Sequence, residues 1–270
     1  MQVKKLPPKT DCETVQILKA LNKASRSLGE LKGAVAKIPN SQILIDTLSL
    51  QEARDSNEVE NIVTTDDEVY QASVDDSKVS QSAKEAVNYA KGMRLGFQFL
   101  TVKGVLSIND IKKIQAIITP NHPIRKLPGT ELKNDKTGEV VFTPPQSHQE
   151  IMDLFANLEA YMNIPELHSI DPLIKMPIIH FQFESIHPFY DGNGRTGRLL
   201  NILYLVHQKL LDIPVLYLSS YIIKNKNDYY RLLQEVRIND GWEAVSYTHL
   251  RAHETRYVIS YAVFCLKRGG

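Results

Sequence analysis

Apolar residues recur along most of this chain at the three- and four-residue spacing of helices. The stretch 10–28 places such residues among polar ones, which predicts an amphipathic helix with these apolar positions: Val15, Leu18, Leu21 and Leu28. The pattern is helical again from about residue 83 to residue 118, where three isoleucines share one face: Ile111, Ile114 and Ile118. A mainly α fold is therefore expected.

Two later segments strengthen the helical prediction. Residues 147–150, SHQE, have the form of a capping box, in which a serine and an acid three positions later satisfy N–H groups at a helix start. Apolar residues then follow at helical spacing: Ile151, Leu154, Phe155, Leu158 and Met162. Further along, RLLNILYLVHQKLL (198–211) predicts a strongly apolar helix.

Two stretches interrupt the helical pattern. Residues 124–145 combine turn formers with the strand-like VVF and end in two prolines, which predicts a β-hairpin or flap. Residues 64–86 are polar and acidic, with few large apolar side chains. We expect a boundary there between a small N-terminal helical region, 1–82, and a main domain, 83–244.

The end of the chain resembles translated adapter DNA. VSYTHLRAHET (245–255) resembles the translation of a sequencing-library adapter, and ISYAVFCL (259–266) resembles a second adapter segment. We therefore expect residues 245–270 to be adapter-derived, with the native gene breaking off near Ala244. Without their four basic residues and one acid, Lys+Arg falls from 32 to 28, Asp+Glu from 31 to 30, and the net charge from +1 to −2. This balance does not support a nucleic-acid surface.

Composition suits a soluble globular protein, with 43% hydrophobic and 23% charged residues. The two cysteines, Cys12 and Cys265, are too far apart and too few to indicate a disulfide framework or a thiolate metal cluster, so a cytoplasmic location is expected. The N-terminus lacks the apolar core of a signal peptide, and no apolar run reaches the roughly 18 residues of a membrane span. No membrane partner is expected.

The densest chemistry lies in IHPFYDGNGRTGR, residues 186–198. GNGRTG satisfies the pattern GxGxxG of dinucleotide-binding units, so an oxidoreductase must be considered. That fold requires a buried strand before the glycines, whereas the preceding residues are polar at several positions and interrupted by Pro188. No acid stands at the ribose-binding distance, and the phosphate-loop ending GK(S/T) is absent. The sequence therefore disfavours both nucleotide-binding folds.

The residue types in this stretch nevertheless indicate an anion site. Gly192, Asn193 and Gly194 allow successive N–H groups to point into one concavity, and an apolar helix follows whose N-terminus attracts anions. Arg195 and Arg198 lie three apart in the first turn and can add charge-assisted hydrogen bonds. A phosphate chain is the expected ligand.

An acid and a base accompany this anion site. The single carboxylate of Asp191 suits Mg²⁺, which takes its other ligands from water and nucleotide phosphates. His187, four residues earlier, can accept a proton from an attacking hydroxyl when its imidazole is neutral. Together these groups predict transfer of a phosphorus-containing group.

HPFYDGNGRTGR resembles the Fic motif, HPFx(D/E)GNGRxxR, with every defining position filled. The resemblance extends over about residues 6–244 and implies the Fic fold, a helical bundle with a β-hairpin flap. It also implies a protein adenylyltransferase, in which a Ser, Thr or Tyr hydroxyl of a target protein attacks the α-phosphorus of ATP. AMP would remain on the target, and pyrophosphate would be released.

The resemblance implies roles for individual residues. His187 would be the base, Phe189 would anchor the loop in the core, and Asp191 would hold Mg²⁺. ATP would be bound by Asp191, Gly192, Asn193, Gly194, Arg195, Thr196, Gly197, Arg198, Tyr229 and Tyr230, the tyrosines lining the adenosine pocket. The hairpin 124–145 would align the target segment by strand addition. A homodimer is left open.

A second motif resembles the family's inhibitory pattern. SNEVEN, 56–61, fits (S/T)xxxE(G/N) and lies N-terminal to the core, as in the class of members, bacterial ones included, with an N-terminal inhibitory helix. By that resemblance Glu60 would pair with Arg198, because one guanidinium cannot satisfy a carboxylate and the γ-phosphate together. The alternative is a solvated acidic face shared with Glu52, Asp55 and Glu58.

Other functions stay open at this point. A kinase-like or other nucleotidyl transfer would use the same phosphate site. A non-catalytic nucleotide-binding regulator is also conceivable, although His187 and Asp191 are intact. A DNA-binding regulator could carry its winged helix beyond Ala244, which leaves nucleic acid undecided as a partner. Tyr229 and Tyr230 could be core aromatics rather than ligand contacts.

Overall fold

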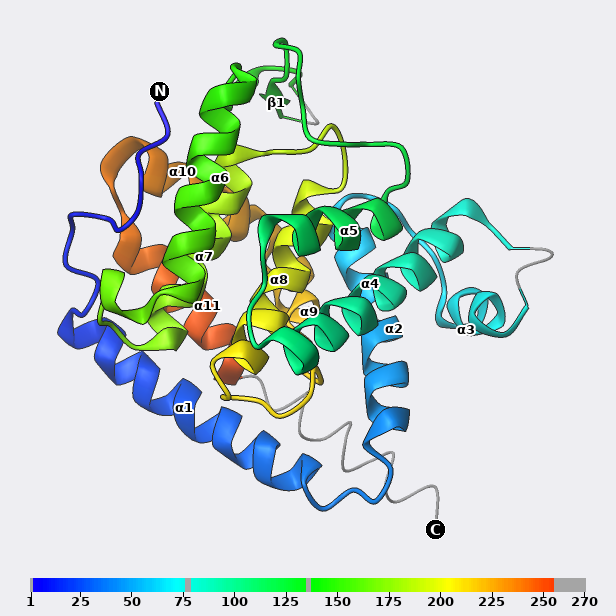
Figure 1. The fold of residues 1–270 in the computed structure, drawn as a ribbon. Helices are drawn as coiled ribbons and strands as arrows, with labels where there is room; N and C mark the ends of the chain where they lie inside the picture. The colour runs from blue at the N-terminus through cyan, green and yellow to red at the C-terminus, as the bar shows by residue number, and fades with distance from the viewer. Residues whose placement is uncertain (1, 76–78, 135–136, 255–270) are drawn as a thin grey trace.

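The structure is a computed structural model that describes residues 2–75, 79–134 and 137–254 (Figure 1). Its first helices are α1 (Val15–Val35), α2 (Ser41–Val59), α3 (Asp66–Val74), α4 (Gln81–Lys103) and α5 (Ile108–Ile118). Strands β1 (Leu132–Lys133) and β2 (Val140–Phe142) precede α6 (His148–Asn163), a 3₁₀ turn (Pro165–Leu167) and α7 (Pro172–Ile186). The chain continues through α8 (Asn193–His207), α9 (Ser219–Lys224), α10 (Lys226–Asn239) and α11 (Trp242–Glu254). The mainly α fold is confirmed.

Helices α7 and α8 form the centre of the bundle (Figure 1). Helix α7 is buried from Leu173 to Ile186 without a break, and α8 is buried from Leu199 to Leu205. Helices α4 and α5 pack against α8, and α6 packs against α7. The short loop between the two central helices is therefore held firmly at both ends. No helix in the described ranges is long and apolar enough to cross a membrane.

Helix α1 is present as predicted, but only part of its predicted apolar face is buried. Val15 is 69% exposed and Leu18 is 43% exposed, whereas Leu28 is buried and Leu21 packs against the core. The other buried positions are Ile17, Ala20, Ala24, Leu31 and Val35. Helix α1 packs mainly against α11. The prediction left out Ile17 and the two alanines, which place the buried face on a different side of the helix from Val15 and Leu18.

Helix α6 begins where predicted but without the predicted capping box. Ser147 is the N-cap residue, yet its hydroxyl accepts no hydrogen bond from the helix. The spacing of SHQE therefore predicted the position of the helix start but not the hydrogen bonds of the serine side chain. Capping boxes occur instead at α3, between Thr65 and Glu68, and at α5, between Ser107 and Asp110. The apolar positions predicted for α6 and α5 are all buried: Ile151, Leu154, Phe155, Leu158, Met162, Ile111, Ile114 and Ile118.

The predicted β-hairpin is also confirmed and stands at one end of the bundle (Figure 1). Its antiparallel strands pair Leu132 with Phe142 and Lys133 with Val140. The Arg237 guanidinium of α10 stacks on the ring of Phe142, 4.2 Å from the ring centroid, which fixes the base of the hairpin. Before the hairpin, an isolated bridge joins Ile124 to Phe189 in the loop between α7 and α8.

A continuous core runs from Leu6 to Ala252. Helix α2 packs against α4 and α9, so the N-terminal region shares this core, and a domain boundary near residue 82 stays a prediction. Helix α11 extends into the stretch expected to be adapter-derived, with Leu250 fully buried. The origin of that stretch stays a prediction, and residues 255–270, with Cys265 among them, lie outside the described residues.

Candidate active site

The loop between α7 and α8 turns sharply at both ends. His187 ends α7 with a φ of 48°, and Gly192 precedes α8 with a φ of 78°. Between them Phe189 is 1% exposed and meets the ring of Phe155 edge-on, with centroids 6.2 Å apart. The Asn193 amide donates to the Phe189 carbonyl at 2.8 Å and accepts from the Phe189 N–H at 2.9 Å. The loop is thus anchored by Phe189 as predicted and closed by Asn193, whose side chain lies on the loop backbone.

His187 carries a partly buried imidazole at the start of this loop. Burial and then the nearby Arg125 charge lower its pKa to about 4, and the Glu60 carboxylate opposes that shift. The ring is therefore neutral at physiological pH, which is the form that accepts a proton.

Asp191 holds a half-exposed carboxylate at the other end of the loop. One oxygen accepts from the Gly192 N–H at 2.6 Å, and the other lies 3.4 Å from an Arg195 nitrogen. The Asp191 main-chain carbonyl accepts from Gln115 at 2.9 Å, which fixes the backbone. A Cβ on Gly192 would lie 2.2 Å from the Thr119 hydroxyl, so this position requires glycine. The carboxylate is 52% exposed, so a cation can reach it.

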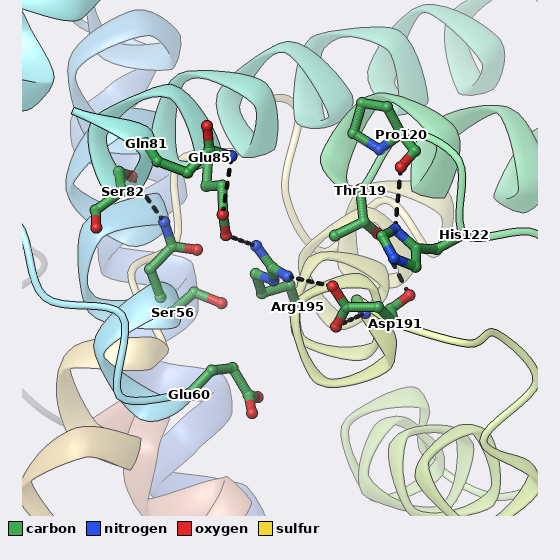
Figure 2. Close-up of polar contacts among 12 residues, drawn as sticks. Ser56, Glu60, Gln81, Ser82, Glu85, Thr119, Pro120, His122, Asp191 and Arg195 are labelled. Atoms are coloured by element: carbon green, nitrogen blue, oxygen red, sulfur yellow. Dashed lines mark hydrogen bonds and ion pairs between the residues drawn. The ribbon is translucent and has the colours of Figure 1, made fainter. Parts of the chain in front are cut away.

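Arg195 lies beneath the loop with its side chain only 4% exposed. Its Nη1 contacts a Glu85 carboxylate oxygen at 2.5 Å, and its Nη2 faces Asp191 (Figure 2). Glu85 comes from α4, so two helices and the loop meet at this guanidinium. The two carboxylates hold the guanidinium in a fixed orientation, because its N–H groups diverge in one plane.

Arg198 is 1% exposed and contacts the end of α2. Its Nε donates to the Ser56 hydroxyl at 2.9 Å, and its Nη2 donates to the Ser56 carbonyl at 2.8 Å and to a Glu60 carboxylate oxygen at 2.8 Å. The Glu60 charge raises the pKa of Arg198 against the opposing effect of burial. A Cβ on Gly194 would lie 2.1 Å from Glu60 Oε1, so glycine lets Glu60 approach α8. The structure therefore brings together the two residues paired by the inhibitory pattern.

Thr196 and Gly197 are packing positions in the first turns of α8. Thr196 is fully buried. A Cβ on Gly197 would lie 2.6 Å from a Glu184 carboxylate oxygen of α7, so glycine permits the close packing of the two central helices. Burial raises the pKa of this Glu184 carboxyl to about 7.

The two candidate adenosine-pocket tyrosines have different surroundings. Tyr229 is 4% exposed, and its hydroxyl lies 2.7 Å from Nε2 of His180 in the core. Tyr230 is 42% exposed and meets Tyr229 edge-on, with ring centroids 5.0 Å apart. The geometry favours Tyr230 over Tyr229 as a residue that a ligand can reach.

Three residues of the site were not assigned a role from sequence. Ser56 belongs to the inhibitory pattern itself, so its place in SNEVEN was the available signal. Glu85 and Arg125 had no such signal, because their contacts with Arg195 and His187 join residues 110 and 62 positions apart. Among the described residues, no group of three or more His, Cys, Asp or Glu side chains could hold a metal ion by itself.

Comparison with known proteins agrees with this geometry. A family model described as Fic/DOC family N-terminal matches residues 18–98, and one described as Fic/DOC family matches residues 105–205. The structure resembles a Fic family protein from Desulfovibrio desulfuricans, with a TM-score of 0.76 and 21% identity over 96% of this chain and 77% of that one. It also resembles a Fic domain containing signaling protein from Bacteroides thetaiotaomicron, with a TM-score of 0.68 and 20% identity over 92% and 97% of the two chains.

The curated relatives share a shorter segment. Protein adenylyltransferase fic-1 of Caenorhabditis elegans is 29% identical over 116 residues, which cover 42% of this chain and 22% of that protein. The chain thus spans about a fifth of the length of this relative. Matches to both family models across most of the chain, together with the helical bundle, hairpin and filled motif, show that the chain belongs to the Fic/DOC family.

Proposed function

We propose that the protein transfers AMP from ATP to a hydroxyl of a target protein. The hydroxyl oxygen attacks the α-phosphorus, and its proton passes to the neutral His187 imidazole. The bond from the α-phosphorus to the bridging oxygen breaks, and pyrophosphate leaves. One observation carries this proposal: the His187 imidazole and the half-exposed Asp191 carboxylate flank a single anchored loop that opens onto the N-terminus of α8.

The same proposal assigns the phosphate contacts to α8 and its arginines. N–H groups at a helix N-terminus attract anions, and Gly194 would let a ligand that displaces Glu60 approach the backbone closely. Arg195 and Arg198 would bind the outer phosphates. Tyr230, with Tyr229 behind it, would line the adenosine pocket.

Asp191 would hold Mg²⁺ beside these phosphates. Its carboxylate suits this role because it is 52% exposed and has a single short hydrogen bond, to the Gly192 N–H. When bound, the ion would neutralise phosphate charge.

We further propose that Glu60 restrains the activity. Its carboxylate occupies Nη2 of Arg198, and Ser56 occupies Nε of the same guanidinium. The γ-phosphate would need these groups, so nucleotide and Glu60 compete for one residue. Replacing Glu60 by glycine should therefore raise AMP transfer.

The hairpin would bind the target segment by adding it as a further strand. Val140 and Val141 are 48% and 40% exposed, so β2 offers accessible side chains, and a target strand would replace the hydrogen bond that Gln234 now donates to the Val141 carbonyl at 2.7 Å. Main-chain contacts of this kind would tolerate different target side chains. A cytoplasmic location and a homodimer stay predictions.

The position of the label in ATP tests the reaction type. We expect the Glu60→Gly protein to transfer label from the α-phosphate, and not from the γ-phosphate, to itself or to a lysate protein. Adding His187→Ala should abolish that transfer while ATP binding persists. Transfer of γ-label would instead indicate a kinase-like reaction, and ATP binding without any transfer would indicate a non-catalytic regulator.

A further inference from the structure

Arg125 is a buried charge close to the catalytic loop. Its side chain is 0% exposed, and burial lowers the pKa of its guanidinium. Within the described ranges, none of its bonds is to a carboxylate. A buried cation without an acid is costly unless hydrogen bonds satisfy it. The hydrogen bonds of Arg125 therefore indicate the role of this buried charge.

The Arg125 guanidinium binds carbonyls from two separate segments. Its Nε donates to the carbonyl of His187 at 2.7 Å, and its Nη2 donates to that of Ile186 at 3.2 Å. The same Nη2 donates to the carbonyl of Pro145 at 2.9 Å. The Ile186 and His187 carbonyls lie at the end of α7, at the proposed catalytic base. The Pro145 carbonyl lies at the end of the hairpin segment, 124–145.

The other end of the hairpin segment is joined to the same loop by main-chain bonds. The Arg125 N–H donates to the Pro188 carbonyl at 2.8 Å, and the Tyr190 N–H donates to the Pro123 carbonyl at 3.3 Å. Residue 124 pairs with residue 189 in the bridge between these bonds. Main-chain hydrogen bonds thus hold the start of the hairpin segment against the loop, and the Arg125 guanidinium holds its end.

The arrangement also suits the end of α7. The last carbonyls of a helix lack intrahelical partners and carry partial negative charge, so a cation stabilises them. His187 adopts a left-handed conformation that a non-glycine residue keeps only when its surroundings hold it. Two of the Arg125 bonds go to the carbonyls at and before this residue.

We propose that Arg125 is a positioning residue that joins both ends of the hairpin to the catalytic loop, so that a target segment bound by the hairpin meets His187 in a fixed geometry. This inference rests on the proposed function, because it takes His187 as the base and the hairpin as the target-binding element. It goes beyond that function by assigning the attachment of the end of the hairpin segment at Pro145 to the Arg125 side chain.

Three variants in the Glu60→Gly background test this role. Arg125→Met removes the guanidinium, Arg125→Lys keeps the charge but loses the planar fork, and Lys126→Met removes the neighbouring exposed charge as a matched control. Amide hydrogen exchange should accelerate together in 140–145 and 186–189 in both Arg125 variants and remain unchanged in the control. AMP transfer should fall about a hundredfold while ATP affinity stays within about twofold, because misplacement by about an ångström costs that much.

The pH dependence of AMP transfer separates the effect of the Arg125 charge from the effect of its hydrogen-bond geometry. Burial lowers the pKa of the His187 ring most; the Arg125 and Arg237 charges lower it further, and the Glu60 charge and the Glu184 backbone raise it. With Glu60 absent throughout, the acid limb of the transfer rate should move to higher pH in Arg125→Met but not in Arg125→Lys, although both transfer slowly.

Two results would overturn the inference: exchange that accelerates in neither segment or in only one, or transfer within about twofold of the parent in both Arg125 variants. If Arg125→Met does not fold, Arg125→Lys decides by the same exchange measurement. If the Glu60→Gly parent transfers no AMP, the proposed function fails, whereas the exchange result still decides whether Arg125 joins the hairpin to the loop.

Discussion

Within the described residues, the Arg198 guanidinium donates hydrogen bonds to Ser56 of α2 and to Glu60, which caps the end of that helix. Its Nη2 donates both to the Ser56 carbonyl and to Glu60, and its Nε donates to the Ser56 hydroxyl. A phosphate that binds Nη2 and Nε of Arg198 must displace both Glu60 and the Ser56 hydroxyl. At the level of single residues, Glu60 supplies the competing charge, and Ser56 supplies a second contact that holds Arg198 against the end of α2.

Ser56→Ala should therefore weaken the restraint without removing it. The Nε of Arg198 loses its hydroxyl acceptor, and a hydrogen bond to a charged group contributes about 1.5–3 kcal/mol. We expect AMP transfer roughly tenfold faster than in the native protein and slower than in Glu60→Gly, measured as initial rates at one ATP concentration.

Thr47→Ala is the matched control for Ser56→Ala. It removes a hydroxyl from the same helix, where that group donates only to carbonyls of α2 itself. A native rate in Ser56→Ala, or an equal increase in Thr47→Ala, would contradict a specific role for Ser56.

At the level of secondary-structure elements, the helical repeat of α2 places Ser56 and Glu60 on the same side of the chain. Glu52, Ser56 and Glu60 are four positions apart and so follow one face. Glu52 accepts from the Ser219 N–H at 2.9 Å and the Ser219 hydroxyl at 2.6 Å, which fixes the middle of the helix against α9. The end of α2 is thus presented to α8 by contacts made two turns earlier.

The last described helix, α11, permits a stability test at the same scale. Leu250 is fully buried where α11 packs against α1, α7 and α10. Leu250→Ala should lower the free energy of unfolding by about 2–5 kcal/mol, as large-to-small changes in a core do. Urea denaturation measures this, with Ile238→Ala as a control because Ile238 is 63% exposed.

A loss near zero in Leu250→Ala would contradict the docking of α11. That outcome would agree with the resemblance of residues 245–270 to translated adapter DNA. A loss within the expected range would show that α11 contributes to the core whatever the origin of its sequence.

At the scale of the whole molecule, periodicity predicted the helical bundle, and residue chemistry predicted the contents of the loop. The buried face of α6 was predicted because large apolar side chains mark it, whereas that of α1 was predicted only in part, at Leu28, because two alanines and Ile17 were left out. The pairing of Glu60 with Arg198 was anticipated only through a motif. Glu85 and Arg125 could not be found, since their partners lie far along the chain and only tertiary packing brings them together.

The bundle thus brings three distant parts of the chain to one loop. Helix α2 supplies Glu60, the hairpin segment supplies Arg125, and α4 supplies Glu85. Together these contacts support the proposal that this loop transfers AMP and that Glu60 restrains the transfer.

Intact-mass spectrometry after incubation with ATP and Mg²⁺ tests this proposal. The native chain, Glu60→Gly and Glu60→Gly with His187→Ala would be compared, alone and with a lysate whose proteins are examined for the same modification. We expect an AMP-sized gain in mass, on the protein or on a lysate target, that is strong in Glu60→Gly, weak in the native chain and absent in the double variant. A folded Glu60→Gly protein that binds ATP yet modifies neither itself nor any lysate protein would contradict it.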